Sequence, residues 1–138
     1  MIDLKTSQDT ADVIELLAAC MGPSFLRVME EFSRYRADAS RSLLGFTKND
    51  ELIGLIGISH EAPHEVLLLH MAVKEPYRNQ GIGRTMIQAY IQDNQIRRME
   101  AETDRDAVDF YRQIGFQTRS IGEKYPGVER FICLYKSK

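Results

Sequence analysis

The sequence predicts an α/β (α+β) fold, in which helices cover one mixed sheet. Two observations support this. The expected order of elements is βααβββαβαββ, with helices interleaved late among the strands, which argues against a helix bundle or a β-sandwich. The 138 residues, 43% apolar and 28% charged, contain no internal repeat, low-complexity tract or linker. We therefore predict a single domain over residues 1–138.

The first third of the chain predicts one short strand and two helices. Residues 2–5 alternate as in a strand. From Thr10 apolar residues recur at helical spacing, and Gly22-Pro23 stops this helix. A second helix begins at Ser24, carries apolar residues on one face and fades at residues 38–40.

Three strands are expected next. Residues 42–47 and 51–59 have strand composition and flank a turn at residues 48–50. Residues 65–73 are almost continuously apolar, which is typical of a strand covered on both faces.

The last third returns to alternating helices and strands. A loop containing Pro76 leads into a helix that begins near Gly81 and Gly83. A strand at 97–103, a helix at 107–114 that ends at Gly115, and two closing strands at 116–121 and 129–135 complete the order.

Composition excludes several classes of protein. The net charge is −2 without a dense Lys/Arg stripe, which argues against nucleic-acid binding. No apolar run is long enough for a membrane span, and acidic residues interrupt the first twenty positions, so no signal core is expected. The two cysteines, Cys20 and Cys133, are far apart, which indicates neither a disulfide scaffold nor a metal site. We expect a cytoplasmic protein without a metal.

Charge is unevenly distributed along the chain. Residues 1–69 carry 6 basic and 11 acidic side chains (−5), and residues 70–138 carry 12 and 9 (+3). Such a split is common in proteins, but it also fits a phosphate-rich ligand held by the second half.

A glycine-rich helix start follows the apolar strand at residues 65–73. Here Arg78-Asn79-Gln80-Gly81-Ile82-Gly83-Arg84 places two glycines and two arginines where a helix begins. Glycine permits close backbone approach to a ligand, and the first helical turn has free N–H groups at the positive end of the dipole. This arrangement favours phosphate binding.

Two other phosphate motifs do not fit. A P-loop requires Gly-Lys-Ser/Thr, whereas Gly83 is followed by Arg84-Thr85. The dinucleotide fingerprint requires a third glycine at position 86, which is Met86.

Two motifs, one after the other along the chain, resemble motifs of the GNAT superfamily of N-acetyltransferases. The segment from Leu69 through Gly83 is similar to its acyl-CoA loop, Arg/Gln-x-x-Gly-x-Gly/Ala. The segment Ala107-Val108-Asp109-Phe110-Tyr111, continuing to Gly115-Phe116, is similar to its Ala-x-x-Phe-Tyr-x-x-x-Gly-Phe helix and turn.

The resemblance implies a mostly antiparallel sheet splayed between the fourth strand, 65–73, and the fifth, 97–103, with acetyl-CoA as cosubstrate in the gap. The pantetheine arm is expected to pair with Met71, Ala72 and Val73. The pyrophosphate is expected on the backbone of Arg78, Asn79, Gln80, Gly81, Ile82, Gly83 and Arg84. Asp104 stands where the superfamily usually has Asn, so as a carboxylate it can only accept a hydrogen bond from pantetheine.

Acetyl transfer to an amine needs a proton acceptor, an oxyanion site and a proton for the leaving thiolate. Glu102 and His70 are candidate bases beside the expected gap; His60, Glu61 and His64 lie in a nearby loop. A bulge near Val73 is expected to direct a backbone N–H at the oxyanion. By its position in the second motif, Tyr111 is the candidate general acid.

For other residues the sequence gives weaker support for a role in binding or catalysis. Arg105 and Arg112 are either ligands of the 3′-phosphate or ordinary exposed cations. Cys20 and Cys133 are expected to pack rather than react, because no activating neighbour is evident.

The predicted function is therefore direct transfer of an acetyl group from acetyl-CoA to a primary amine of a small molecule or a protein. The alternatives are a catalytically silent acyl-CoA-binding module and a structural domain without CoA affinity. Both a monomer and a homodimer paired through the final strand, 129–135, remain open.

Overall fold

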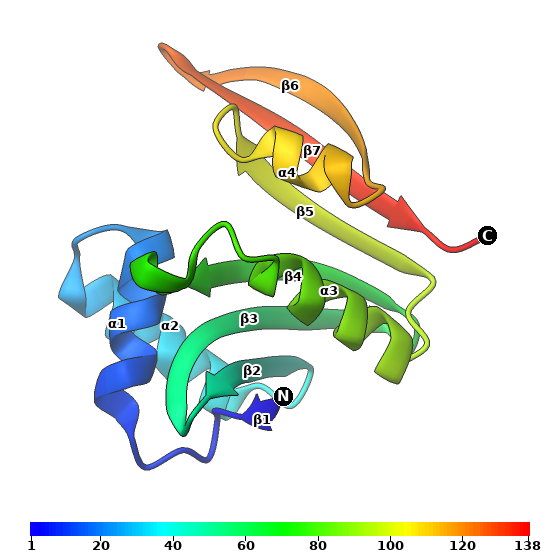
Figure 1. Cartoon of the computed structure of the whole chain (residues 1–138). Coiled ribbons are helices and arrows are strands. Elements are labelled where there is room, and N and C mark those ends of the chain that lie inside the picture. Colours follow the sequence, from blue (N-terminus) through cyan, green and yellow to red (C-terminus); the bar gives the residue numbers. More distant parts are fainter.

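Seven strands form one sheet in the order β1-β2-β3-β4-β5-β7-β6 in the computed structural model, which describes residues 1–138 (Figure 1). The predicted order of elements is confirmed, with a short 3-10 helix (η1) added before the third α-helix. The elements are β1 (Ile2–Asp3), α1 (Thr10–Met21), α2 (Phe25–Ala37), β2 (Arg41–Lys48), β3 (Glu51–Ala62), β4 (Glu65–Val73), η1 (Glu75–Tyr77), α3 (Ile82–Asp93), β5 (Arg98–Asp104), α4 (Val108–Gln113), β6 (Gln117–Tyr125) and β7 (Val128–Lys136).

Local signals set most of the boundaries. The Ser24 side chain accepts a hydrogen bond from the Arg27 N–H at 3.4 Å and so caps α2. Asn49 and Asp50 both have positive φ, 52° and 64°, as in the two-residue turns that suit the twist of a β-hairpin.

Helices cover both faces of the sheet and enclose two hydrophobic cores. Leu55 and Ile56 are neighbours on β3, yet Leu55 packs with α1 and α2 whereas Ile56 packs with α3 and α4. Successive side chains on a strand point to opposite faces, so the two cores lie on opposite sides of the sheet. β4 contributes to both cores, as its apolar run predicts.

The sheet is splayed between β4 and β5, as expected. These strands pair in parallel only from Glu65–Leu68 to Arg98–Ala101. On the other side of β4, Leu68 pairs with Ile58 and His70 with Gly57, which leaves Leu69 as a bulge. The prediction of a bulge near Val73 is therefore wrong: the bulge lies at Leu69, where the pairing of β4 with β5 stops.

The final strand is not an edge. β7 lies between β5 and β6 and pairs with both, so β6 forms the edge of the sheet. The suggestion that residues 129–135 offer a free edge for a homodimer is therefore wrong. None of the helices combines the length and apolar character needed to cross a membrane.

Candidate active site

The loop between β4 and α3 forms one wall of a cavity of about 560 Å³. Gly81 is the N-cap of α3 and has a φ of 80°, and Asn79 is also left-handed at 63°. Non-glycine residues rarely adopt this region, so the loop needs glycine at position 81. The first N–H groups of α3 have no partners within the helix and lie at its positive end, which suits an anion.

Side chains tie this loop to the sheet. The Tyr77 hydroxyl donates to Glu51 at 2.8 Å, and the Lys74 ammonium group lies 3.3 Å from the same carboxylate at the start of β3. Arg78 Nε donates to the Val73 carbonyl at 2.9 Å. The loop is thus held against the ends of β3 and β4.

Gly83 brings α3 close to the gap in the sheet. A Cβ at this position would lie 3.3 Å from both the Met71 sulfur and a Phe110 ring carbon. Any side chain here would crowd the side chains that line the cavity, so glycine keeps that space open.

Most of the residues predicted to bind CoA line this single cavity. Gln80 does not; its side-chain amide donates to the Pro76 carbonyl at 3.3 Å. The sequence analysis missed Tyr77 and three residues of α4 and its end, Phe110, Gln113 and Ile114. Their i, i+3, i+4 spacing on one helix face was a signal that could have found them. The lining residues are Met71, Ala72, Val73, Tyr77, Arg78, Asn79, Gly81, Ile82, Gly83, Arg84, Phe110, Gln113 and Ile114.

A second cavity of about 240 Å³ opens where β4 and β5 separate. It shares Met71 with the first cavity, so the two meet at this residue. Its lining includes five of the ionisable groups singled out by the sequence, together with Arg130, which the sequence analysis did not select. The lining residues are Cys20, Leu68, Leu69, His70, Met71, Glu102, Thr103, Asp104, Ala107, Tyr111 and Arg130.

Tyr111 lines the second cavity from α4. The residue is 6% exposed, and its hydroxyl forms no hydrogen bond within the chain. Burial raises the pKa of Tyr111 above its usual value, so the hydroxyl remains protonated at neutral pH. An unpaired donor therefore faces the gap.

Glu102 also faces this cavity, but its carboxylate is already paired. Glu102 Oε2 accepts from Arg130 Nε at 3.0 Å and from Lys124 Nζ at 3.4 Å. Burial alone would raise the pKa of Glu102, but the hydrogen bond from Arg130 and the two positive charges outweigh it and hold the pKa below its ordinary value. This carboxylate is consequently a weak base.

Asp104 ends β5 at the cavity and caps the turn into α4. Its Oδ1 accepts from the Ala107 N–H at 3.0 Å, which helps to orient the helix that carries Tyr111.

The remaining histidines and arginines from the sequence analysis lie outside both cavities. The His60 ring bonds the Tyr90 hydroxyl, and His64 Nδ1 lies 3.0 Å from the Gln95 carbonyl. Arg105 pairs with Glu129 at 2.7 Å. Arg112 pairs with Asp109, also at 2.7 Å. These contacts agree with the second of the two predictions for Arg105 and Arg112, that both are ordinary exposed cations.

Cys20 is exposed as a whole residue, yet its thiol lies against the protein at the second cavity. The thiol donates to the Leu17 carbonyl at 3.4 Å, and desolvation raises the pKa of Cys20 to about 11. The thiolate is therefore scarce at neutral pH.

Comparison with known proteins agrees with this geometry. Residues 10–116 match the family model described as the acetyltransferase (GNAT) family. A Bacillus methanolicus protein, described as an uncharacterized N-acetyltransferase in the lysA 3′ region, is 30% identical over 63 residues. That match spans 46% of this chain and 52% of the Bacillus protein, about half its length.

Solved structures share the fold across almost the whole chain. An aminoglycoside 6′-N-acetyltransferase complexed with coenzyme A superimposes with a TM-score of 0.79 at 14% identity, covering 99% of this chain and 97% of that chain. The ribosomal-protein-S18-alanine N-acetyltransferase of Escherichia coli gives a TM-score of 0.76 at 17% identity, covering 98% and 91%. The splayed sheet, the glycine loop and the family match together place this chain in the GNAT acetyltransferase family.

Proposed function

We propose that residues 1–138 act as one acetyl-CoA-dependent N-acetyltransferase domain that transfers the acetyl group directly to a primary amine in a ternary complex. The observation that carries this proposal is the pair of cavities that meet at Met71. One suits a phosphate-bearing cosubstrate, and the other presents ionisable groups to an acceptor.

Acetyl-CoA occupies the larger cavity in this proposal. Its pyrophosphate lies on the free N–H groups at the start of α3, with Arg78 and Arg84 adding positive charge. Its pantetheine arm lies along Met71, Ala72 and Val73, the part of β4 beyond its pairing with β5. The thioester then reaches the smaller cavity at Met71.

The acceptor is a small molecule or a protein amine. Of the two solved structures named above, one is named as an enzyme for a small aminoglycoside and the other as an enzyme for a ribosomal protein. These names support an amine acceptor and do not decide between a small molecule and a protein. Glu102 and Asp104 line the smaller cavity with two carboxylates and Arg130 with one positive charge, and the remaining net negative charge of this lining favours a protonated amine.

An alkylamine must lose a proton before it attacks. With a pKa of ~10.4 this costs about 4.6 kcal/mol at pH 7 if the proton goes to solvent. Transfer to a carboxylate with an ordinary pKa costs about 8 kcal/mol, and Glu102 is a weaker base than that. We therefore propose that Glu102 attracts the amine and that the proton leaves to water.

Tyr111 is the proposed donor to the departing sulfur. Its raised pKa makes full proton transfer to a thiolate unfavourable, so its hydroxyl acts chiefly as a hydrogen-bond donor. Direct transfer also requires no acetylated cysteine. With a pKa of about 11, only about one Cys20 in ten thousand is a thiolate at pH 7.

Release of free CoA thiol from acetyl-CoA tests the proposal. The acceptors are phenethylamine, free lysine, kanamycin and a peptide with an N-terminal alanine. We expect thiol release with at least one amine, intersecting initial-velocity lines, and no loss of rate in Cys20→Ala. Parallel lines together with an inactive Cys20→Ala variant would contradict direct transfer.

Thermal unfolding separates the alternatives. Acetyl-CoA at 1 mM with a Kd of ~10 μM adds about 2.7 kcal/mol of stability. A silent acyl-CoA-binding module shows this shift and releases no thiol with any acceptor, whereas a structural domain shows neither.

A further inference from the structure

His70 lies on the face of the sheet opposite α3, where it is hydrogen-bonded to Tyr35. It lies on β4 directly after the Leu69 bulge and lines the smaller cavity. Its Nδ1 atom is 2.5 Å from the hydroxyl oxygen of Tyr35 on α2. Its second ring nitrogen, Nε2, has no partner within the chain, which leaves it available to a molecule in the cavity.

The Tyr35 hydroxyl has a single partner. Tyr35 is 0% exposed, and His70 is the only residue to which its hydroxyl is hydrogen-bonded. The hydroxyl lies over Gly57, the β3 residue that pairs with His70, and a Cβ on Gly57 would overlap it. The position of the hydroxyl is therefore set by the sheet and the helix together.

This geometry determines which nitrogen of His70 carries the proton. A buried hydroxyl proton needs an acceptor, because leaving it unpaired costs about 1–3 kcal/mol. The acceptor within reach is Nδ1 of His70. When Tyr35 donates to Nδ1, the neutral imidazole holds its proton on Nε2 and presents an N–H to the cavity.

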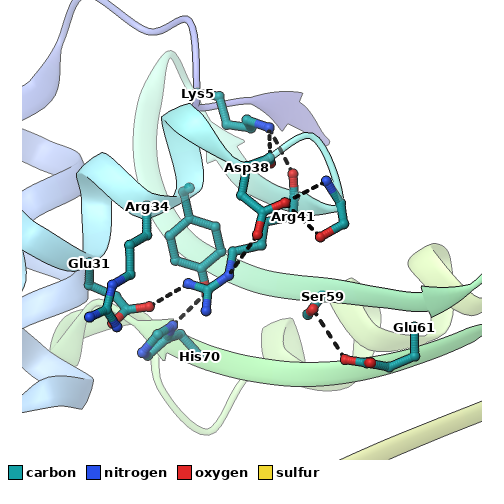
Figure 2. Close-up of polar contacts among 10 residues, drawn as sticks. Lys5, Glu31, Arg34, Asp38, Arg41, Ser59, Glu61 and His70 are labelled. Atoms are coloured by element: carbon teal, nitrogen blue, oxygen red, sulfur yellow. Dashed lines mark hydrogen bonds and ion pairs between the residues drawn. The ribbon is translucent and has the colours of Figure 1, made fainter.

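Burial keeps the imidazole neutral. Arg41 lies with its guanidinium 5.4 Å above the Tyr35 ring and pairs with Glu31 at 2.6 Å. Figure 2 shows Arg41 between the carboxylates of Glu31 and Asp38, next to His70. Burial lowers the pKa of His70; the charge of Glu31 opposes this shift, and the smaller effect of Arg41 adds to it. Other elements also contribute titratable or charged groups to the cavity, namely Cys20, Glu102, Asp104, Tyr111 and Arg130.

We propose that neutral His70 donates a hydrogen bond from Nε2 to the thioester oxygen of acetyl-CoA, and that Tyr35 is the positioning residue that selects this tautomer. The inference deepens the proposed function and rests on it. It assigns His70 a role different from that of a base: in this tautomer Nε2 has no free lone pair with which to accept a proton.

The step balances without a protein base. The acceptor R–NH3⁺ loses one proton to water and attacks the thioester carbon as R–NH2. Negative charge develops on the carbonyl oxygen, where His70 donates. The C–S bond then breaks with its electron pair on sulfur, the second amine proton ends on sulfur, and the third remains on the amide nitrogen. The products are the acetamide, CoA thiol and one proton in solution.

Two substitutions at His70 distinguish donor from base. The side-chain amide of Gln can replace an Nε2–H donor but cannot take a proton from an amine. We expect His70→Ala to lower kcat about 100-fold, the size of effect seen when an oxyanion donor is lost, with little change in KM for acetyl-CoA. His70→Gln should recover part of this loss, so that its kcat lies only about tenfold below that of the unsubstituted protein. If His70→Gln is as inactive as His70→Ala, the donor role is wrong.

Tyr35→Phe tests the positioning role. It removes the hydroxyl and keeps the ring, so we expect a several-fold loss of kcat with unchanged KM for acetyl-CoA. Unchanged kcat in Tyr35→Phe would overturn the positioning role.

A measurement that needs no activity separates this inference from the proposed function. Nitrogen-15 NMR of the imidazole reports the tautomer of His70 in the free protein. We expect a neutral Nε2–H form at pH 7 that shifts toward a tautomer mixture in Tyr35→Phe. An Nδ1–H form would refute the inference even if thiol release is observed, and absence of thiol release would refute the proposed function even if the tautomer is as expected.

Discussion

The hydroxyl group of Tyr35 lies directly over Gly57, so that no side chain larger than hydrogen fits at position 57. Gly57 pairs with His70, and Tyr35 bonds the His70 ring. One glycine on β3 therefore controls the distance between α2 and the sheet at the residue that faces the smaller cavity.

Gly57→Ala should destabilise the protein by about 1–3 kcal/mol, because the added methyl forces Tyr35 out of a closely packed site. Urea unfolding measures this change. The matched control is Gly54→Ala on the same strand, where the new methyl meets the flexible end of Met86 at 3.1 Å and the Ala72 carbonyl oxygen at 3.3 Å, a milder crowding than the overlap with Tyr35. Equal losses for the two variants would contradict the specific role of Tyr35.

Gly81→Ala should weaken acetyl-CoA binding. The φ of 80° costs an alanine about 1 kcal/mol, and relief of that strain would turn the N–H groups at the start of α3 away from the cavity. Gly127→Ala is the control, since Gly127 has a φ of 79°, open space around it and no place in either cavity. Both variants should lose similar stability, and the thermal shift produced by acetyl-CoA should shrink only in Gly81→Ala. A shift of equal size in the two variants would contradict the assignment of the loop.

Tyr111→Phe should lower kcat by about 10- to 100-fold and change KM for acetyl-CoA much less, because the hydroxyl assists the departing sulfur and not the bound cosubstrate. Steady-state thiol release gives both values. Tyr90→Phe serves as the control, because the Tyr90 hydroxyl bonds His60 outside the cavities. An unchanged kcat at saturating acceptor would remove Tyr111 from the mechanism.

The pH dependence should follow the amine. Only the neutral amine attacks, so with an alkylamine acceptor of pKa ~10.4 kcat/KM should rise about tenfold per pH unit between pH 6 and pH 9 and be lost as the pH falls, whereas with a peptide N-terminus of pKa about 8 the rise should level off near pH 8. Glu102 does not alter this slope, because its pKa lies below the ordinary carboxyl value and its charge is constant over that range. A plateau that begins near pH 6 would reveal a protein base.

Glu102→Gln separates attraction of the amine from proton transfer. We expect a higher KM for the amine, an unchanged kcat and the same pH slope, because Gln has similar shape but no charge. A large fall in kcat would restore Glu102 as the base.

Prediction from the sequence succeeded where the information was local. The glycine loop could be predicted because glycine permits close backbone approach to a ligand and because a helix start exposes N–H groups whatever surrounds it. It did not reveal the pairing of Glu102 with Lys124 and Arg130, which lie 22 and 28 residues away in the chain. No periodicity in the sequence encodes those contacts.

The sequence by itself determined the order of strands and helices, the splayed sheet implied by the family resemblance, and the glycine loop at the start of α3. Tertiary structure decided which groups are free to act at the gap. It put the bulge at Leu69, paired Glu102 with two cations, left the Tyr111 hydroxyl unpaired and joined Tyr35 to His70 across 35 positions of the chain. The physical reason is that the charge and proton state of a side chain depend on its neighbours in space, and at this site those neighbours come from α1, α2, β4, β5, α4 and β7.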